Sequence, residues 1–223
     1  MNHCQIEAEA RRVLAELWRE REQLGHAPGA APMTMLDPGL AAKALGINYE
    51  YHDELGRFGD KGDRFETAGF IDRPRGLIAV SRRFSFEVQR FTGAHELGHY
   101  VLHREAVQHR DRPILGVEHA RPRMEREADY FAACFLAPRK LLIESFTQRF
   151  GRQPLRLTDD VRWELKHDDF DPTDSGDGLR DFAVAAAAAR SFRGVRFRSL
   201  AEQFRLSVSA MAIRLMELGL IEG

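Results

Sequence analysis

The sequence has few cysteines, little net charge and no long hydrophobic run, and each absence narrows the possible functions. Only Cys4 and Cys134 occur among the 223 residues, so no disulfide framework is expected and a reducing cytoplasm fits the chain. The formal net charge of -1 gives no overall field that would attract nucleic acid or a membrane surface. No apolar run approaches membrane-spanning length, and the charged start MNHCQIEAEARR is not typical of a signal peptide.

Hydrophobic residues make up 43% of the sequence and charged residues 30%, which is typical of a globular protein. Apolar residues recur at helical spacing in most segments and alternate in a few short ones. We therefore predict an α+β fold that is mainly helical, with a small antiparallel or mixed sheet. The predicted helices cover Ile6–Leu24, Asp37–Leu45, Met124–Ala137, Lys140–Phe150 and Gly178–Ser191, and the predicted strands cover Ile47–His52, Ala68–Ile71 and Gly76–Val80.

The stretch HELGHYVLH, from His95 to His103, carries the most specific pattern in the chain. In a helix, His99 falls at about 40° from His95, His103 at about 80° and Glu96 at about 100°. Three imidazoles and a carboxylate therefore share one face, while Leu97 on the opposite face is expected to enter a core. An H-E-x-x-H helix of this kind provides two histidine ligands for Zn²⁺ and a glutamate that can transfer a proton.

A third zinc ligand must come from elsewhere in the chain. The spacing that would supply a third histidine downstream fails, because Leu102 and Glu105 occupy the required positions. The predicted helix after residue 123 instead offers Glu125 and Asp129, which lie one turn apart on one face. We predict that Glu125 binds the metal and that Asp129 orients a ligating histidine. Glu127, about 200° round from Glu125, is expected to point away and is the fallback ligand.

These residues predict hydrolysis of a peptide bond. Zinc on His95, His99 and Glu125 would activate a water molecule, and Glu96 would act as general base and then protonate the leaving amine. His103 is a candidate for stabilising the oxyanion, and a structural, hydrogen-bonded histidine is the alternative interpretation. Weaker candidates for that role are Tyr100, His109 and His119. The strand Gly76–Val80 is the expected edge against which an extended substrate peptide would lie.

Several local features around the metal helix are also predicted. Thr92 is expected to cap the helix, which should continue through His103 to about Ala106, and His109–Pro122 should be a loop. Three arginines near the start of this helix are expected to be solvated: Arg82, Arg83 and Arg90. The acidic residues of Asp168–Gly178 are also expected to be solvated.

The C-terminal part of the chain is expected to form a separate helical region. A change in composition divides residues 1–151, the catalytic domain with its N-terminal helix, from residues 152–223. Within the second region, Leu200–Ile221 has a helix-turn-helix pattern, with a turn near Ser207 and a second helix from Val208. Nearby arginines allow an alternative function as a DNA-binding regulator with a merely structural zinc. They are Arg190, Arg193, Arg196, Arg198, Arg205 and Arg214. A catalytically inactive binding module is the third hypothesis.

The three segments QRFTGAHELGHYVLH, EREADYFAACFLAP and LAEQFRLSVSAMAIRLMELGLI together resemble the ImmA/IrrE family of bacterial zinc metallopeptidases. The resemblance covers most of residues 35–150 and the last 25 residues. It implies a thermolysin-like zincin core, Zn²⁺ on His95, His99 and Glu125, and Glu96 as base. It also implies cleavage of a helix-turn-helix transcriptional repressor in a stress, DNA-damage or mobile-element response. One departure is Asp129, where the family usually has Asn and other zincins have Asp.

Overall fold

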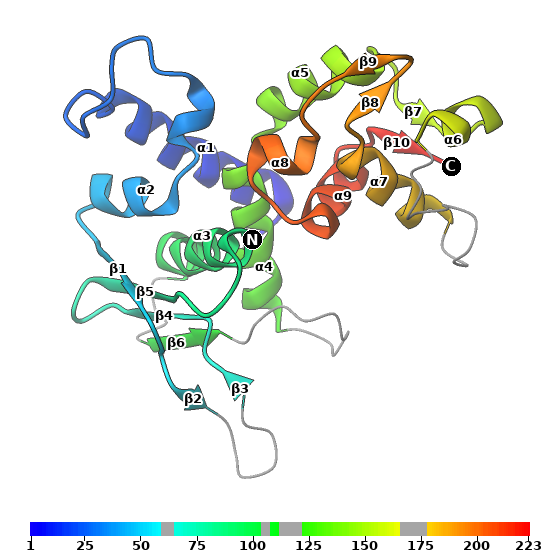
Figure 1. Ribbon diagram of the computed structural model, residues 1–223. Coiled ribbons are helices and arrows are strands. Elements are labelled where there is room, and N and C mark those ends of the chain that lie inside the picture. Colours follow the sequence, from blue (N-terminus) through cyan, green and yellow to red (C-terminus); the bar gives the residue numbers. More distant parts are fainter. Residues whose placement is uncertain (59–64, 104–107, 112–121, 166–177) are drawn as a thin grey trace. The chain divides into compact units, whose positions relative to one another are not determined.

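The computed structural model divides the chain into two compact units, Met1–Leu136 and Ala137–Gly223 (Figure 1). It describes the chain except for residues 59–64, 104–107, 112–121 and 166–177. The predicted α+β class, mainly helical with a small mixed sheet, is confirmed. The functional boundary expected near residue 151 stays a prediction. The predicted solvated acidic stretch Asp168–Gly178 lies almost entirely outside the described residues.

The first unit combines four α-helices with a mixed sheet in its described residues. Its helices begin at residues suited to the position: Asn2 and Asp37 both accept a backbone N–H from the first turn of the helix that follows. The buried face of the first helix carries Ile6, Ala10, Val13 and Leu17 at helical spacing. The elements are α1 (His3–Arg19), a 3₁₀ helix (Pro32–Met35), α2 (Pro38–Ala44), β1 (Asn48–His52), β2 (Arg57–Phe58), β3 (Phe65–Glu66), β4 (Gly69–Asp72), β5 (Leu77–Ser81), α3 (Phe86–Leu102), β6 (Gln108–Asp111) and α4 (Arg123–Leu136).

The four-stranded sheet has the order β1-β5-β4-β6. β5 runs parallel to its neighbour β1 and antiparallel to its other neighbour β4. β4 also pairs antiparallel with β6. The predicted hairpin of β4 and β5 is therefore confirmed, but the prediction that Gly76–Val80 forms a free edge is wrong. β5 is an inner strand because β1 pairs with it on the side opposite β4. β6 forms within the stretch expected to be a loop and makes β4 an inner strand as well. In β5, three consecutive residues, Ile78, Ala79 and Val80, are buried, as expected for an inner strand that is covered on both faces.

Helix α3 packs against strands β4 and β5, as Figure 1 shows. The helix begins at Phe86, and the Ser85 side chain caps it by accepting the N–H of Val88. The prediction that Thr92 caps the helix is wrong, since Thr92 lies buried within it. Ser85 precedes it in sequence and is equally suited to an N-cap, so the helix starts two turns earlier. The helix ends at Leu102, short of the expected end near Ala106, with His103 as its C-cap.

Arg73, in the turn between β4 and β5, secures the C-terminal end of α3. Its Nη2 donates to the carbonyl oxygens of His99, Tyr100 and His103 at 2.7, 2.7 and 2.8 Å. The guanidinium also lies over the Tyr100 ring, 4.7 Å from its centroid. A cation at a helix C-terminus interacts favourably with the last carbonyl groups and the helix dipole. The hairpin therefore fixes the end of the helix that carries the predicted metal ligands.

Replacing Arg73 with Ala is expected to lower the free energy of unfolding by about 1–3 kcal/mol, because charged hydrogen bonds to partly buried carbonyl groups are lost. Urea unfolding followed by circular dichroism measures the change. Arg75→Ala is the matched control, since Arg75 lies in the same turn with its side chain 79% exposed and pairs only loosely with Asp72. Equal effects of the two substitutions would contradict the capping role.

Arg90 differs from its expected solvated position. It is 5% exposed, donates from Nη2 to the carbonyl oxygen of Leu36, and lies over the Phe86 ring. The prediction for Arg90 was wrong because its buried partner lies 54 residues away in sequence. Arg82 and Arg83 are exposed as predicted and form surface ion pairs with acidic residues.

Helices α3 and α4 pack closely against each other at Gly98. A Cβ atom added at Gly98 would lie 3.1 Å from the Phe131 ring and 3.2 Å from the carbonyl oxygen of Ala128. Any residue larger than glycine at position 98 would press against α4, so glycine permits the close packing of α3 and α4. Leu97, on the face of α3 predicted to enter the core, is fully buried.

The second unit contains the predicted helix-turn-helix segment. Ser199 caps its first helix and forms a capping box with Glu202, Arg205 adopts a left-handed conformation, and Ser207 caps the second helix at Val208. The second helix packs on the alanine-rich helix of Gly178–Ala188. The elements are α5 (Arg139–Phe150), β7 (Leu155–Arg156), α6 (Asp159–Leu165), α7 (Gly178–Ala188), β8 (Ser191–Phe192), β9 (Val195–Arg196), α8 (Leu200–Phe204), α9 (Val208–Glu217) and β10 (Ile221–Glu222).

The arginines of the second unit are not gathered on the helix-turn-helix. Arg214, the one basic residue within α8 and α9, is fully buried and donates to the carbonyl oxygen of Ala137 and to Glu217. Arg190 forms an ion pair with Glu202. The outer face of α9 instead exposes Val208, Ser209, Ile213 and Glu217. This face lacks the cations with which a recognition helix contacts phosphates.

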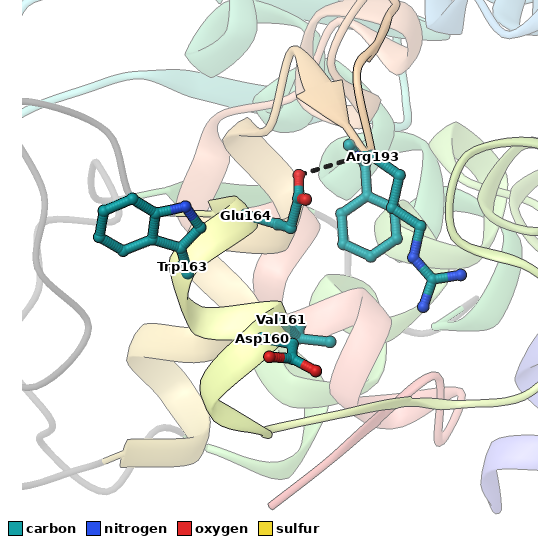
Figure 2. Close-up of a pocket in the computed structure, with 6 residues that line it drawn as sticks. Asp160, Val161, Trp163, Glu164 and Arg193 are labelled. Atoms are coloured by element: carbon teal, nitrogen blue, oxygen red, sulfur yellow. Dashed lines mark hydrogen bonds between the residues drawn. The ribbon is translucent and has the colours of Figure 1, made fainter.

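The second unit also has a shallow pocket of about 320 Å³ between α6 and the β8–β9 hairpin (Figure 2). Its lining includes Asp160 and Glu164, and Glu164 accepts the backbone N–H of Arg193 at 2.9 Å. Trp163 points away from that hydrogen bond and is 79% exposed. The predicted metal-binding and catalytic residues all lie outside this pocket.

Candidate metal centre

Three predicted ligands converge in the first unit. The Nε2 atoms of His95 and His99 lie 2.9 Å apart, and the Glu125 carboxylate lies 3.5 Å from the first and 3.4 Å from the second. One ligand atom from each of these residues lies within 4.8 Å of the others, so the set can hold a metal ion. Tetrahedral zinc with bonds of about 2.0–2.1 Å would place its ligand atoms about 3.3 Å apart. The nitrogen and carboxylate donors therefore fit zinc in both chemistry and spacing.

The two helices place these ligands for simple geometric reasons. His95 and His99 are one turn apart on α3, and Glu125 lies in the first turn of α4, which crosses α3 at Gly98. Both histidines are fully buried, and the Glu125 side chain is 13% exposed. Burying a carboxylate without a partner costs free energy, so a metal ion shared with the two imidazoles would stabilise Glu125 in this buried position.

Asp129 lies where the helix phase predicts. Its Oδ1 is 2.9 Å from Nδ1 of His95, one turn along α4 from Glu125. Because a carboxylate accepts hydrogen bonds, Nδ1 of His95 carries the proton and Nε2 keeps its lone pair. That lone pair is on the side of the ring that approaches His99 and Glu125. This contact is the one that carboxylates make beside ligating histidines, and it leaves Nε2 of His95 able to bind a metal.

Glu96 lies on α3 next to His95 and is fully buried. Strand β4 passes directly over it: a Cβ atom added at Gly69 would lie 3.3 Å from Cγ of Glu96 and 2.5 Å from Cγ2 of Thr92. Any larger residue at position 69 would push against the predicted base. Our sequence reasoning missed Gly69, although a glycine inside a strand pattern often marks a close approach.

His103 has both ring nitrogens engaged by protein groups. Nδ1 lies 3.0 Å from Nδ1 of His99, and Nε2 lies 3.0 Å from Oε2 of Glu127. Its side chain is 8% exposed. The structure thus places His103 behind His99, on the side of that ring away from Nε2.

Glu127 lies outside the three-ligand set, but it does not face solvent. It is 9% exposed and accepts hydrogen bonds from His103, from Arg123 and from the ammonium group of Met1. Burial alone would raise the pKa of Glu127, but these three hydrogen bonds outweigh it and lower the pKa to about 2. Glu125, and not Glu127, thus lies beside Nε2 of His95 and His99, and the partners of Glu127 were not predicted.

Of the three weaker candidates, Tyr100 is the one whose side chain the structure describes. Tyr100 packs against the guanidinium of Arg73. His109 belongs to β6, of which only the backbone is described, and His119 lies outside the described residues.

The family comparison agrees with this site. Residues 42–162, which contain the sheet, both ligand helices and α5, match the model of the IrrE N-terminal-like domain, Peptidase_M78. The chain belongs to this peptidase family. The match covers over half of the sequence and supports a metallopeptidase-type function with a protein substrate. No curated protein matches the chain significantly. Among the described helices of this family member, none is long and apolar enough to cross a membrane.

Proposed function

We propose that this member of the IrrE-like peptidase family is a zinc-dependent endopeptidase. The observation that carries the proposal is the convergence of two buried imidazole nitrogens and one carboxylate beside the fully buried Glu96. His95, His99 and Glu125 would hold the metal, and Asp129 orients His95. Zinc, when bound, supplies Lewis-acid activation of water and of the peptide carbonyl group.

Glu96 performs the proton transfers in the proposed reaction. Its carboxylate takes a proton from the attacking water and then delivers that proton to the amine of the departing peptide. Burial against β4 keeps the Glu96 carboxylate in one place and away from bulk solvent. Both ring nitrogens of His103 already contact protein groups, so we assign His103 to orientation of His99 and not to the oxyanion.

The proposed substrate is a helix-turn-helix transcriptional repressor in the cytoplasm, cut during a stress, DNA-damage or mobile-element response. Support comes from the sequence resemblance to ImmA/IrrE peptidases together with the family match. Direct DNA binding has less support, because the single basic residue of α8 and α9 is buried. A DNA-binding regulator should show an affinity that falls steeply with salt, and we expect no binding even at low salt.

If a helix-turn-helix repressor is encoded beside the gene, incubating the zinc-loaded chain with that repressor tests the proposal. We expect mass spectrometry to find two repressor fragments from a single cut, and chelation of zinc to abolish them. Adding zinc back should restore cleavage. Fragments that form equally in the chelated sample would contradict a zinc-dependent mechanism, and an intact repressor with zinc-loaded protein would contradict this choice of substrate.

A further inference from the structure

A chain of hydrogen-bonded side chains extends from His99 away from the three metal ligands. Nδ1 of His99 contacts Nδ1 of His103 at 3.0 Å, and Nε2 of His103 contacts Oε2 of Glu127 at 3.0 Å. The side chains of His103 and Glu127 are 8% and 11% exposed. The contact between two imidazoles of one helix is thus anchored by a carboxylate from a second helix.

The direction of these hydrogen bonds follows from the carboxylate. A carboxylate oxygen accepts, so Nε2 of His103 donates to Glu127. A neutral His103 ring then has its lone pair on Nδ1 and accepts there, so Nδ1 of His99 is the donor. His99 is left with its lone pair on Nε2, the atom that lies 2.9 Å from Nε2 of His95 and 3.4 Å from Glu125.

Glu127 is itself held in a fixed orientation. Its Oε1 accepts from Nε of Arg123 at 2.8 Å and from the ammonium group of Met1, and these leave Oε2 directed at His103. Arg123 and Glu127 are one turn apart on α4, the helix that also supplies Glu125 and Asp129. A single helix therefore supplies both the third ligand and the carboxylates behind the two histidines.

We propose that His103 and Glu127 are positioning residues that fix His99 in the tautomer whose Nε2 carries the lone pair that binds metal. The inference rests on the proposed zinc site. His95 receives its carboxylate directly from Asp129, whereas His99 receives the same support from Glu127 through the His103 ring. Without this support, His99 can place its proton on Nε2 and must give it up before a metal binds.

Zinc affinity and the tautomer of His99 test the relay in the full chain. His103→Phe keeps a ring of similar size but removes both nitrogens, and Glu127→Gln keeps the shape but removes the charge. We expect each variant to bind zinc about 10–100-fold more weakly in competition with a chromophoric chelator, the usual effect of losing a group behind a metal ligand. In the zinc-free protein, ¹⁵N NMR should show His99 with its proton on Nδ1 in wild type and distributed over both nitrogens in the variants.

His52→Phe is the matched control, because His52 also contacts a glutamate, Glu50 at 2.9 Å, but on the exposed strand β1. Its zinc affinity should equal that of wild type. The relay is refuted if folded His103→Phe and Glu127→Gln both bind zinc as tightly as wild type and leave the His99 spectrum unchanged. A wild-type chain that binds no zinc would refute the proposed metal site instead, and the zinc-free NMR spectra would still decide whether the relay exists. His103→Phe separates the relay from folding effects, since Glu127 also supports Arg123.

Discussion

Glu96→Gln is expected to lower the rate of peptide hydrolysis by about 10²–10⁴-fold, because a positioned general base contributes that much to a reaction rate. Zinc content should remain at that of wild type, since Glu96 lies outside the set of His95, His99 and Glu125. The amide has the size of the carboxylate, so the close contact with β4 at Gly69 is kept. The kcat/KM for repressor cleavage and the zinc content by mass spectrometry are the measurements.

The control for Glu96→Gln is Glu9→Gln on α1, which removes the same charge from a half-buried residue that pairs with Arg12. It should leave both activity and zinc content unchanged. The comparison separates an endopeptidase from a protein without hydrolytic activity. An inactive Glu96→Gln protein with zinc bound supports an endopeptidase, whereas full activity of the variant contradicts Glu96 as base. A wild-type chain without any hydrolytic activity would favour the binding module.

The arrangement of the candidate metal ligands could be predicted from the sequence because most of its geometry is local. The 3.6-residue period places His95 and His99 on one side of α3, and the same period places Glu125 and Asp129 on one side of α4. The structure brings these four residues together within hydrogen-bonding or metal-binding distance. What the sequence could not show directly is that the two faces meet, and Gly98 at the helix crossing is the feature that permits it.

The errors, and the contacts that were not predicted at all, concern residues that are distant in sequence. The strand expected to form an edge is an inner strand, because β1 pairs with β5 on the side opposite β4. Arg90 has its partner at Leu36, and Arg73 reaches three carbonyl groups at the end of α3, 26 to 30 residues away. Helical and strand periodicity describe which face a residue occupies, but not which element covers that face. The cap at Ser85 is a different kind of error, since two hydroxyl residues were both suitable.

Glu125→Ala is expected to weaken zinc binding by more than about 100-fold, because losing even a group behind a ligand costs about 10–100-fold. Competition with a chromophoric chelator gives the affinity, and excess zinc should restore part of the activity. Glu125 also lies in the first turn of α4, where a negative charge interacts favourably with the helix dipole and stabilises the helix. Glu87→Ala separates the two effects, since Glu87 occupies the first turn of α3 without belonging to the metal set.

Glu127, two residues after Glu125 on α4, is the comparison that best tests Glu125 as the third ligand. Glu127→Ala should weaken zinc binding less than Glu125→Ala, because Glu127 contacts His103 and reaches the metal set only through that ring. Excess zinc should therefore restore full activity to the Glu127 variant at concentrations where the Glu125 variant remains largely metal-free. The reverse order of zinc affinities would make Glu127 the third ligand and would mean that the first turn of α4 rotates by about 200° when the metal binds.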